Sequence, residues 1–315
     1  MRIQPRSITS SRERQSLLLG SLGVLGFSFS LIATRAADAD LGGTIVGLGR
    51  GLIAALLAGI LLLVLHERPP PRRYWRGLVL VALGVVAGFP LLSSLALQSL
   101  PAAHGAVVAG LLPAATAVMA VLRANERPSR GFWMACALGV VSVLAFAVTE
   151  GGGRPQAGDL LLLLAVVLGG LGYAEGGRLA RDLGGWRVIC WALILAAPIL
   201  APVVGVAVVR HGLSARPQAW LGFGYVSVVS MFLAFFAWYG GLALGGVARI
   251  SQLQLVQPVL TLTWAALLLG ERVNLATAGA ALVVILSAAV SRRTKISPRA
   301  RLEIVAIPNA ETRSG

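Results

Sequence analysis

The sequence predicts an all-helical integral membrane protein. Of its 315 residues, 57% are hydrophobic and only 12% are charged, whereas soluble domains carry roughly 25% charged residues. The polar residues form short islands between apolar runs of about 17 to 25 residues, the length that crosses a ~30 Å hydrocarbon core as a helix. Transmembrane barrels would instead show alternating segments of about 10 residues. Composition and run length therefore exclude a soluble protein and favour a helical bundle.

Ten apolar runs are long enough to cross the membrane as helices. They predict spans at residues 16–34, 42–65, 76–98, 102–122, 131–149, 158–179, 187–209, 218–243, 247–269 and 273–291. An even number of spans places both chain ends on one side. The first run ends in small residues, as a cleaved signal peptide does. We nevertheless expect it to remain as a span, because the sixth run looks like its counterpart.

The basic residues predict the orientation of these spans. With the N-terminus in the cytoplasm, 21 of the 27 Lys and Arg residues face the cytoplasm, five face outside, and Arg50 lies within the membrane. The outer face holds acidic residues that neutralise it: Asp38, Asp40, Glu150, Asp159 and Glu271. The net charge of +15 thus reports topology, and no nucleic-acid partner is expected. The basic tails, 1–15 and 292–315, are expected to be disordered and to contact anionic lipids on the cytoplasmic face.

The two halves of the sequence resemble each other at a shift of 145 residues. This shift aligns Trp75 with Trp220, Pro113 with Pro258, Glu126 with Glu271 and Arg127 with Arg272. We therefore predict two repeats, 16–149 and 158–291, with five spans each. Because five is odd, the second repeat enters the membrane from the opposite side. Inverted repeats are typical of secondary transporters, which bind substrate near the midplane between the halves.

Two segments carry a resemblance to a known family. SQLQLVQPVLTLTWAALLLGER at 251–272 and its fainter partner GAVVAGLLPAATAVMAVLRANER at 105–127 are similar to the drug/metabolite transporter superfamily, specifically its members with two EamA domains. The resemblance covers about residues 16–291. It implies a multi-pass exporter of small metabolites, amino acids or drug-like solutes in the bacterial inner membrane, with a central cavity. Members of the family commonly carry an Arg in the second span, where this chain has Arg50.

Arg50 is the deepest charge in the sequence. It lies about 13 Å inside the membrane if the second span begins near Leu41. A charge at this depth costs several kcal/mol unless it faces water, a carboxylate or backbone carbonyls. Arg50 is therefore expected either to contact a substrate or to bind carbonyls at a helix break, which the neighbouring glycines Gly47, Gly49 and Gly51 would permit.

Apart from Asp159 at the very start of the sixth span, Glu175 is the single acidic residue within an expected span. Burial would favour its protonated form, as a proton carrier requires. Its spacing from Arg178 also allows an i,i+3 ion pair that would keep it charged, and both interpretations stay open. Tyr173, two residues earlier, offers an aromatic wall with a hydroxyl group.

The ninth span has the most polar interior, with Gln252, Gln254 and Gln257 before Pro258. Pro258, like Pro113 in the first half, is expected to break its helix and free a backbone carbonyl. Glutamine amides both donate and accept, so they suit a zwitterionic or polyhydroxyl substrate. The alternative is hydrogen bonding between packed helices.

Aromatic and histidine side chains supply further candidates. Trp264, in mid-span, is a candidate for the cavity wall, while we interpret Trp238 and Tyr239 mainly as residues of the interfacial aromatic belt. Tyr239 and His104 are candidate gate residues. Glu126 and Glu271 are expected to end and anchor helices.

Other classes of protein lack support in the sequence. Its histidines, His66, His104 and His211, are in separate segments, so an intramembrane enzyme is not indicated. The Gly-rich stretch at 150–154 lacks the Lys-Ser/Thr of a phosphate loop. Cys136 and Cys190 have no neighbouring ligands, so we expect neither a metal nor another cofactor.

We therefore expect a secondary transporter that exports an amino acid or a drug-like solute by alternating access. In this hypothesis Arg50 orients a carboxylate, Gln254 and Gln257 bind polar groups, and Glu175 carries a coupling proton. The alternatives are a proton-independent facilitator or exchanger of sugar- or nucleoside-like metabolites, and a membrane scaffold that transports nothing.

Overall fold

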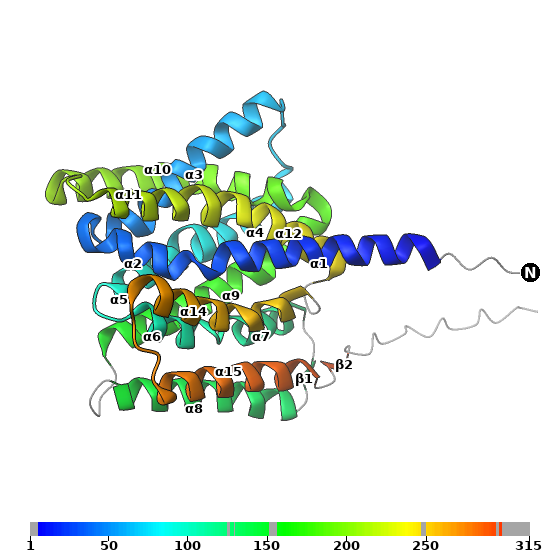
Figure 1. Cartoon of the computed structure of the whole chain (residues 1–315). Coiled ribbons are helices and arrows are strands. Elements are labelled where there is room, and N and C mark those ends of the chain that lie inside the picture. Colours follow the sequence, from blue (N-terminus) through cyan, green and yellow to red (C-terminus); the bar gives the residue numbers. More distant parts are fainter. Residues whose placement is uncertain are drawn as a thin grey trace, which may run out of the picture.

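The protein is a bundle of nearly parallel helices (Figure 1). The computed structural model describes residues 6–124, 127–128, 130–150, 156–246, 250–293 and 296–297. In this part of the chain, strand is limited to an antiparallel pair, β1 (Arg127–Pro128) with β2 (Ile296–Ser297). The predicted all-helical class is confirmed.

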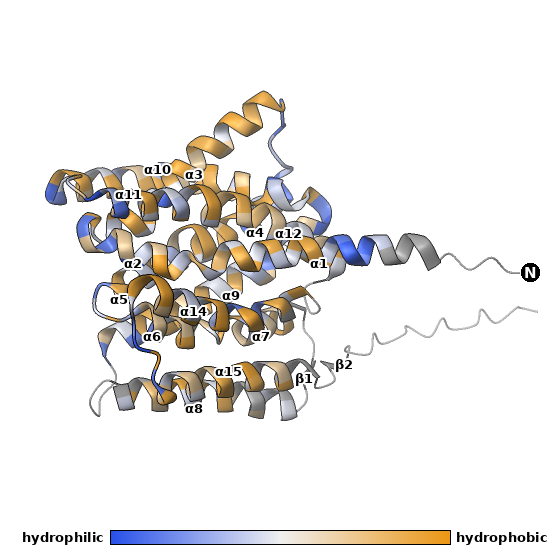
Figure 2. Ribbon diagram, viewed as in Figure 1, coloured by the Kyte–Doolittle hydropathy of each residue, from blue (hydrophilic) through white to orange (hydrophobic). Residues whose placement is uncertain are grey.

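Apolar residues follow the helices along their length, and hydrophilic residues gather toward the helix ends (Figure 2). Seven segments of the described chain are long and apolar enough to cross a membrane: Ser11–Leu41, Gly43–Val64, Arg72–Leu97, Ala102–Leu122, Ala157–Leu183, Gly185–His211 and Pro217–Gly245. Shorter apolar helices occupy Ala137–Phe146, Leu253–Leu269 and Leu275–Leu286. Large apolar side chains such as Leu22, Leu56 and Leu63 are exposed, which lipid tolerates and water does not. The protein is a multi-pass membrane protein.

The first half of the chain contains the helices up to Glu150. They are α1 (Arg6–Ser28), α2 (Ser30–Leu41), α3 (Gly43–Val64), η1 (Arg72–Tyr74), α4 (Trp75–Val81), η2 (Ala82–Gly88), α5 (Phe89–Leu97), α6 (Ala102–Ala109), α7 (Leu112–Ala124) and α8 (Arg130–Glu150). The first expected span, 16–34, ends too early, because α2 continues to Leu41. Asp38, which was expected outside and beyond this span, therefore lies within the helix instead.

The second half contains the helices from Ala157 onward. They are α9 (Ala157–Leu183), α10 (Gly185–His211), α11 (Pro217–Gly224), η3 (Tyr225–Leu233), α12 (Ala234–Gly245), η4 (Ser251–Val256), α14 (Gln257–Leu269) and α15 (Leu275–Arg293). Pro198 and Pro202 lie inside α10 without ending it. Most helix ends fall within a few residues of the expected spans.

The same irregularities occur in both halves. The segments η2 and η3 are π-helical turns that interrupt the helices 75–97 and 217–245. Helix α7 begins at Leu112 and α14 begins at Gln257, 145 residues later, each one residue before a proline. Gly42 and Gly184 adopt positive φ angles of 79° and 86° at the ends of α2 and α9, a conformation that favours glycine.

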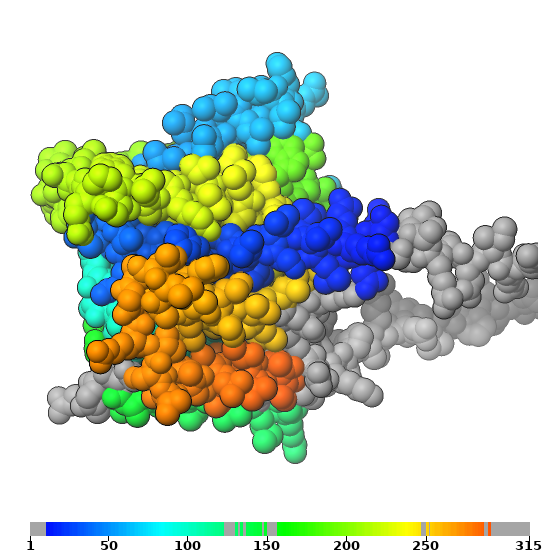
Figure 3. Space-filling model, viewed as in Figure 1, coloured from blue at the N-terminus to red at the C-terminus, as the bar shows by residue number. Residues whose placement is uncertain are grey.

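Helices from the two halves interleave in the bundle. Helix α1 packs on α12, α3 on α10, α7 on α9, and α8 on α15. In the space-filling view the N-terminal helix lies between segments of the second half (Figure 3). The centre of the bundle is thus lined by side chains from both halves.

Candidate functional site

Two adjoining internal cavities lie at the centre of the bundle. The larger, about 40 Å³, is lined by Arg50 of α3, Tyr173 of α9 and Gln257 of α14, with Phe27 and Phe235 among its apolar walls. The smaller, about 10 Å³, is lined by Gln254, Gln257, Pro113, Pro258 and Thr261, among others. Leu31, Ala109, Leu112 and Gln257 border both cavities. The larger one has room for about three water molecules, which is too little for an amino acid in this conformation.

Arg50 is buried at the edge of the larger cavity, where its guanidinium bonds neutral groups. Nη2 donates to the Pro90 carbonyl at 2.8 Å, and Nη1 donates to Thr34 Oγ1 at 3.3 Å. Gly47 allows this arrangement, because a Cβ there would lie 2.8 Å from the Cα of Leu91 on α5. The close packing of α3 on α5 therefore brings Arg50 to the Pro90 carbonyl.

Asp38 lies near Arg50, and the sequence analysis missed it. It is 5% exposed, and Ser94 Oγ donates to its Oδ1 at 2.6 Å. Its Oδ2 has no hydrogen-bond partner among the described residues. The spacing of Thr34 and Asp38, one helical turn apart, was the available signal. It was overlooked because Arg35 between them suggested the end of the span.

Tyr173 belongs to an aromatic cluster beside the cavity. Its ring lies 6.0 Å from those of Phe27 and Phe235 and 5.7 Å from that of Trp238, between centroids. The buried amide of Gln254 is close to the Tyr173 hydroxyl. Neither Gln254 Oε1 nor Nε2 has a hydrogen bond of normal geometry within the described chain. An unpaired buried amide is costly, which makes Gln254 a candidate ligand for a bound solute.

Trp238 and Tyr239 are completely buried, so the interpretation of these two residues as an interfacial belt is wrong. Helix α12 is enclosed by α1, α9 and α10, and both side chains point into the bundle. The Tyr239 hydroxyl donates to the Gly172 carbonyl at 3.2 Å. Tyr239 therefore helps to join α12 to α9.

Glu175 forms the ion pair that its spacing allowed. Arg178 Nη2 lies 2.5 Å from Glu175 Oε1, with Glu175 buried and Arg178 54% exposed. Glu175 also packs on α4, where a Cβ at Gly77 would lie 2.5 Å from its Oε1. Glu175 lines neither central cavity. A role for it as proton carrier stays a prediction.

The remaining candidates of the ninth span have different environments. Trp264 Nε1 donates to Ser28 Oγ at 3.2 Å, which ties α14 to α1, and Trp264 does not line the two cavities. The side chain of Gln252 lies outside the described residues, as does Glu126. Pro113 and Pro258 both line the smaller cavity.

Polar contacts join the two halves at the end of the bundle where α2 ends and α6 begins. Glu271 accepts hydrogen bonds from the backbone N–H groups of Ala102 and Ala103, at 2.9 and 2.7 Å. It thereby caps helix α6 and lies 3.7 Å from Arg35. Glu271 was expected to end and anchor a helix. Its contacts with Ala102 and Ala103 place it at the start of α6, which it caps. Arg35 also donates to the carbonyls of Leu97 and Leu100.

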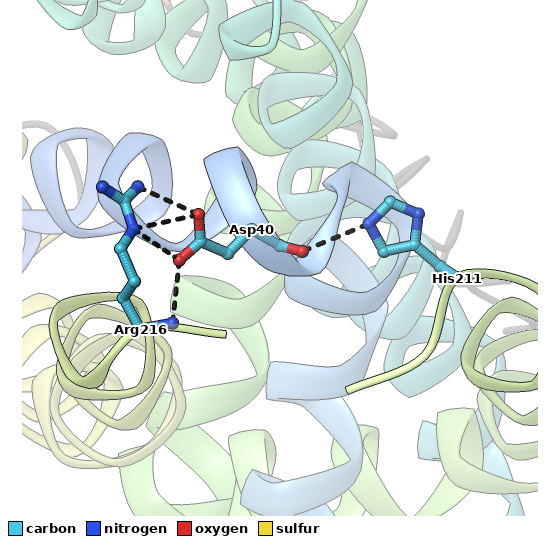
Figure 4. A network of polar contacts seen from close by, with 3 residues as sticks. All are labelled: Asp40, His211 and Arg216. Carbon is cyan, nitrogen blue, oxygen red and sulfur yellow. Dashed lines mark hydrogen bonds and ion pairs between the residues drawn. The ribbon is translucent and has the colours of Figure 1, made fainter. Parts of the chain in front are cut away.

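Asp40 makes a second connection at this end (Figure 4). The Arg216 guanidinium makes three hydrogen bonds of 2.9 to 3.3 Å to the two Asp40 carboxylate oxygens, and the Arg216 backbone N–H adds a fourth at 2.9 Å. This bidentate pairing raises the pKa of Arg216. His211 Nε2 lies 3.2 Å from the Asp40 carbonyl oxygen. Helix α2 is thus joined to the loop between α10 and α11.

His104, a candidate gate residue, lies at the same end of the bundle and is buried. Its Nε2 lies 2.6 Å from Asp159 Oδ1, and the other Asp159 oxygen accepts the Gln156 N–H at 2.8 Å. Asp159 thus caps α9 and orients His104 on α6. A candidate gate residue is therefore bound to the start of the second half.

An ion pair joins the halves at the opposite end. Arg187, at the start of α10, lies 2.5 Å from Glu67, which follows α3. The guanidinium lowers the pKa of the Glu67 carboxyl. The central cavities therefore lie between ionic contacts at both ends of the bundle.

The fold and the site define a multi-pass membrane protein with a largely apolar cavity between its helices, into which a few polar groups project. The EamA-like transporter family matches residues 14–148 and 156–293, so the chain belongs to that family, and the resemblance to the drug/metabolite transporter superfamily is confirmed. Membership implies a small-molecule substrate and supports a role other than enzyme.

Two curated proteins and a solved structure are similar to the chain. The uncharacterized transporter YdeK of Bacillus subtilis is 45% identical over 87% of this chain and 96% of its own length. Protein PecM of Dickeya dadantii is 25% identical over 78% of this chain and 86% of its own. A protein crystal structure, 19% identical, matches 88% of this chain and 96% of its own with a TM-score of 0.61. That last similarity shows the fold alone.

Proposed function

We propose that this protein is a secondary transporter that exports a small zwitterionic metabolite, an amino acid in the first instance, by alternating access. The observation that carries the proposal is the convergence of Arg50, Tyr173 and Gln257 from three helices on one cavity. Arg50 would bind the carboxylate through charge-assisted hydrogen bonds. Gln254 and Gln257 would bind the polar groups at the other side of the site.

The apolar wall of the cavity suits an amino-acid side chain. Phe27, Phe235 and the Tyr173 ring supply aromatic surface next to the polar groups. Mostly apolar lining with a few placed polar groups is typical of small-molecule sites. Trp264 and Gln252 belong to the neighbouring segment, and we propose that they contribute when the cavity enlarges.

We infer that the chain has ten spans in two inverted five-helix repeats, 16–149 and 158–291, between the tails 1–15 and 292–315. The paired π-helical turns η2 and η3 support this inference, as do the equivalent starts of α7 and α14. The basic-residue distribution supports cytoplasmic termini in the bacterial inner membrane, with anionic lipids next to the tails.

Alternating access requires the cavity to open at one end at a time. At the proposed outer end, opening would separate Asp40 from Arg216, and Glu271 from the start of α6. At the proposed cytoplasmic end it would separate Glu67 from Arg187. His104 and Tyr239, which join elements near these paths, would act as gate residues. Pro113 and Pro258 supply helix breaks at which the repeats can flex.

Proton coupling through Glu175 is the proposal with the least geometric support. Glu175 is paired with Arg178 and lines neither central cavity. Proton-independent exchange, including that of sugar- or nucleoside-like solutes, is the alternative. The Glu175→Gln variant tests the role of this residue, because loss of the response to a pH gradient would identify a carrier. An unchanged pH response would exclude Glu175 from coupling.

The proposal is tested with proteoliposomes and a mixed pool of radiolabelled amino acids, with and without an imposed pH gradient. Substrate movement by the wild type, and its loss in Arg50→Ala with Arg181→Ala as the control, would support it. Arg181 is an exposed arginine near the end of α9. Unchanged transport by Arg50→Ala would contradict the assigned role. If no solute moves, even with sugars and nucleosides added, the result would favour the alternative of a membrane scaffold that transports nothing.

A further inference from the structure

Asp38 is a buried acid that the proposed transport site does not yet use. Ser94 Oγ donates to Oδ1 at 2.6 Å, whereas Oδ2 has no partner in the described part of the chain. Thr34, one turn earlier on α2, accepts from Arg50. Asp38 and Arg50 therefore belong to one polar cluster between α2, α3 and α5, and Arg50 connects that cluster to the cavity.

Few charged groups face Asp38 from the elements around it. Helix α2 packs on α3, α5, α6, α11, α14, η3 and α1. Helix α3 contributes Arg50, and α2 itself carries Arg35 and Asp40, the latter bound to Arg216. Helix α6 contributes His104, which is bound to Asp159. Helices α5, α11 and α14 contain no charged residue. The segment η3 contributes the titratable Tyr225, and the charged residues of α1 lie toward its N-terminal end.

Asp38 is thus the acid that balances Arg50. Arg50 donates hydrogen bonds to a hydroxyl and two carbonyl oxygens, none of which carries a full charge. A buried guanidinium is costly without a counter-charge, and Asp38 interacts with it electrostatically. Together, Arg50 and an ionised Asp38 give the site a net charge of zero.

We propose that Asp38 sets the charge selectivity of the site, so that it accepts zwitterions and disfavours monoanions. This inference rests on the proposed function of Arg50. A zwitterion brings a carboxylate to Arg50 and carries its own compensating ammonium group. A monoanion would leave the site with one uncompensated negative charge, close to Asp38. When the Oδ2 atom of Asp38 takes up a proton from water, the carboxyl becomes neutral and that repulsion is removed.

The test compares uptake of leucine, a zwitterion, with uptake of N-acetylleucine, a monoanion of similar shape, by proteoliposomes. In Asp38→Asn we expect the ratio of N-acetylleucine to leucine uptake to rise about tenfold, because one unit charge near the site is removed. Asp38→Glu should restore the wild-type ratio. Asp159→Asn, a matched control at another buried aspartate, should leave the ratio unchanged. A purely structural role for Asp38 would lower both rates without changing their ratio.

A second measurement needs no variant. The wild-type ratio should rise as the pH falls from about 8 to about 5, since protonation of Asp38 imitates Asp38→Asn. A constant ratio across this range, or the wild-type ratio in Asp38→Asn, overturns the inference while leaving amino-acid transport intact. If the wild type moves neither solute but moves other amino acids, charge selection between these two is overturned. If it moves no amino acid, the proposed function fails as well.

Discussion

The two halves of the chain provide the same architecture and different chemistry. At the helix starts before Pro113 and Pro258, the first half has Ala109 and Leu112 where the second has Gln254 and Gln257. All four residues border the central cavities. The amide groups are therefore not needed for the helix break, which both halves form. Their presence in one half points to binding.

The charged residues show the opposite asymmetry. When the starts of α3 and α10, Gly43 and Gly185, are aligned, Arg50 corresponds to Ala192. The same alignment places Ala180 opposite Asp38. The first half thus supplies charge and the second supplies amides, as recognition of a solute with distinct ends would require.

The largest expected effect comes from removing the charge of the first half. Arg50→Gln should weaken binding of carboxylate-bearing solutes about 100-fold, because a buried charge-assisted pair is lost. The corresponding amides of these solutes should bind no more weakly, because they carry no carboxylate for Arg50 to bind. Competition of unlabelled solutes against labelled substrate measures both. Equal losses for carboxylates and amides would show that Arg50 is structural.

Gly47→Ala tests how Arg50 is positioned. The added Cβ would lie 2.8 Å from the Leu91 Cα, so α3 and α5 must separate, at a cost of about 1–3 kcal/mol. Thermal unfolding in detergent should show a lower Tm and transport should fall. Gly205→Ala is the control, since a Cβ there meets no atom within 4 Å. Equal Tm values for the two variants would contradict this role. The equivalent residue of the second half is Ile189, so the close approach is specific to the first half.

The variants Gln254→Ala and Gln257→Leu place in the second half the residue types that the first half has at the equivalent positions. Each removes one or two neutral hydrogen bonds to the solute, so we expect affinity to fall about fivefold per variant. Leu112→Met, a volume-conserving change in the first half, should have little effect. Measured affinities that do not change in the glutamine variants would show that these amides serve helix packing.

Much of the fold was predictable because membrane spans depend on length and hydrophobicity. The expected span 42–65 and helix α3 differ by one residue at each end. The errors arose where contacts between helices decide the position of a side chain more than its own polarity or residue type does. Asp38 is polar, but Ser94 binds it inside the bundle. Trp238 has the composition of a belt residue, but α1, α9 and α10 surround its helix.

The candidate site was accessible to sequence reasoning only in part. Arg50, Gln254 and Gln257 stand out because charge and amides are rare in apolar spans. Which of these residues share a cavity depends on the packing of α3, α9 and α14, which periodicity does not encode. The pairing of Glu175 followed from i,i+3 spacing, whereas the pairing of His104 with Asp159 links segments 55 residues apart.

The smallest expected effect concerns the ion pair that joins the halves at the proposed cytoplasmic end. Glu67→Gln should barely change the Tm, because exposed ion pairs contribute little. Since Arg187 lowers the folded-state pKa of Glu67, its contribution is present above the unfolded pKa and is lost as the pH falls through the folded value. The variant should therefore match the wild type most closely at low pH.

We expect Glu67→Gln also to favour the inward-open form, and Asp40→Asn to favour the outward-open form. Labelling of single cysteines introduced next to each pair would report these shifts, and equal labelling in both variants would contradict a gating role for the pairs.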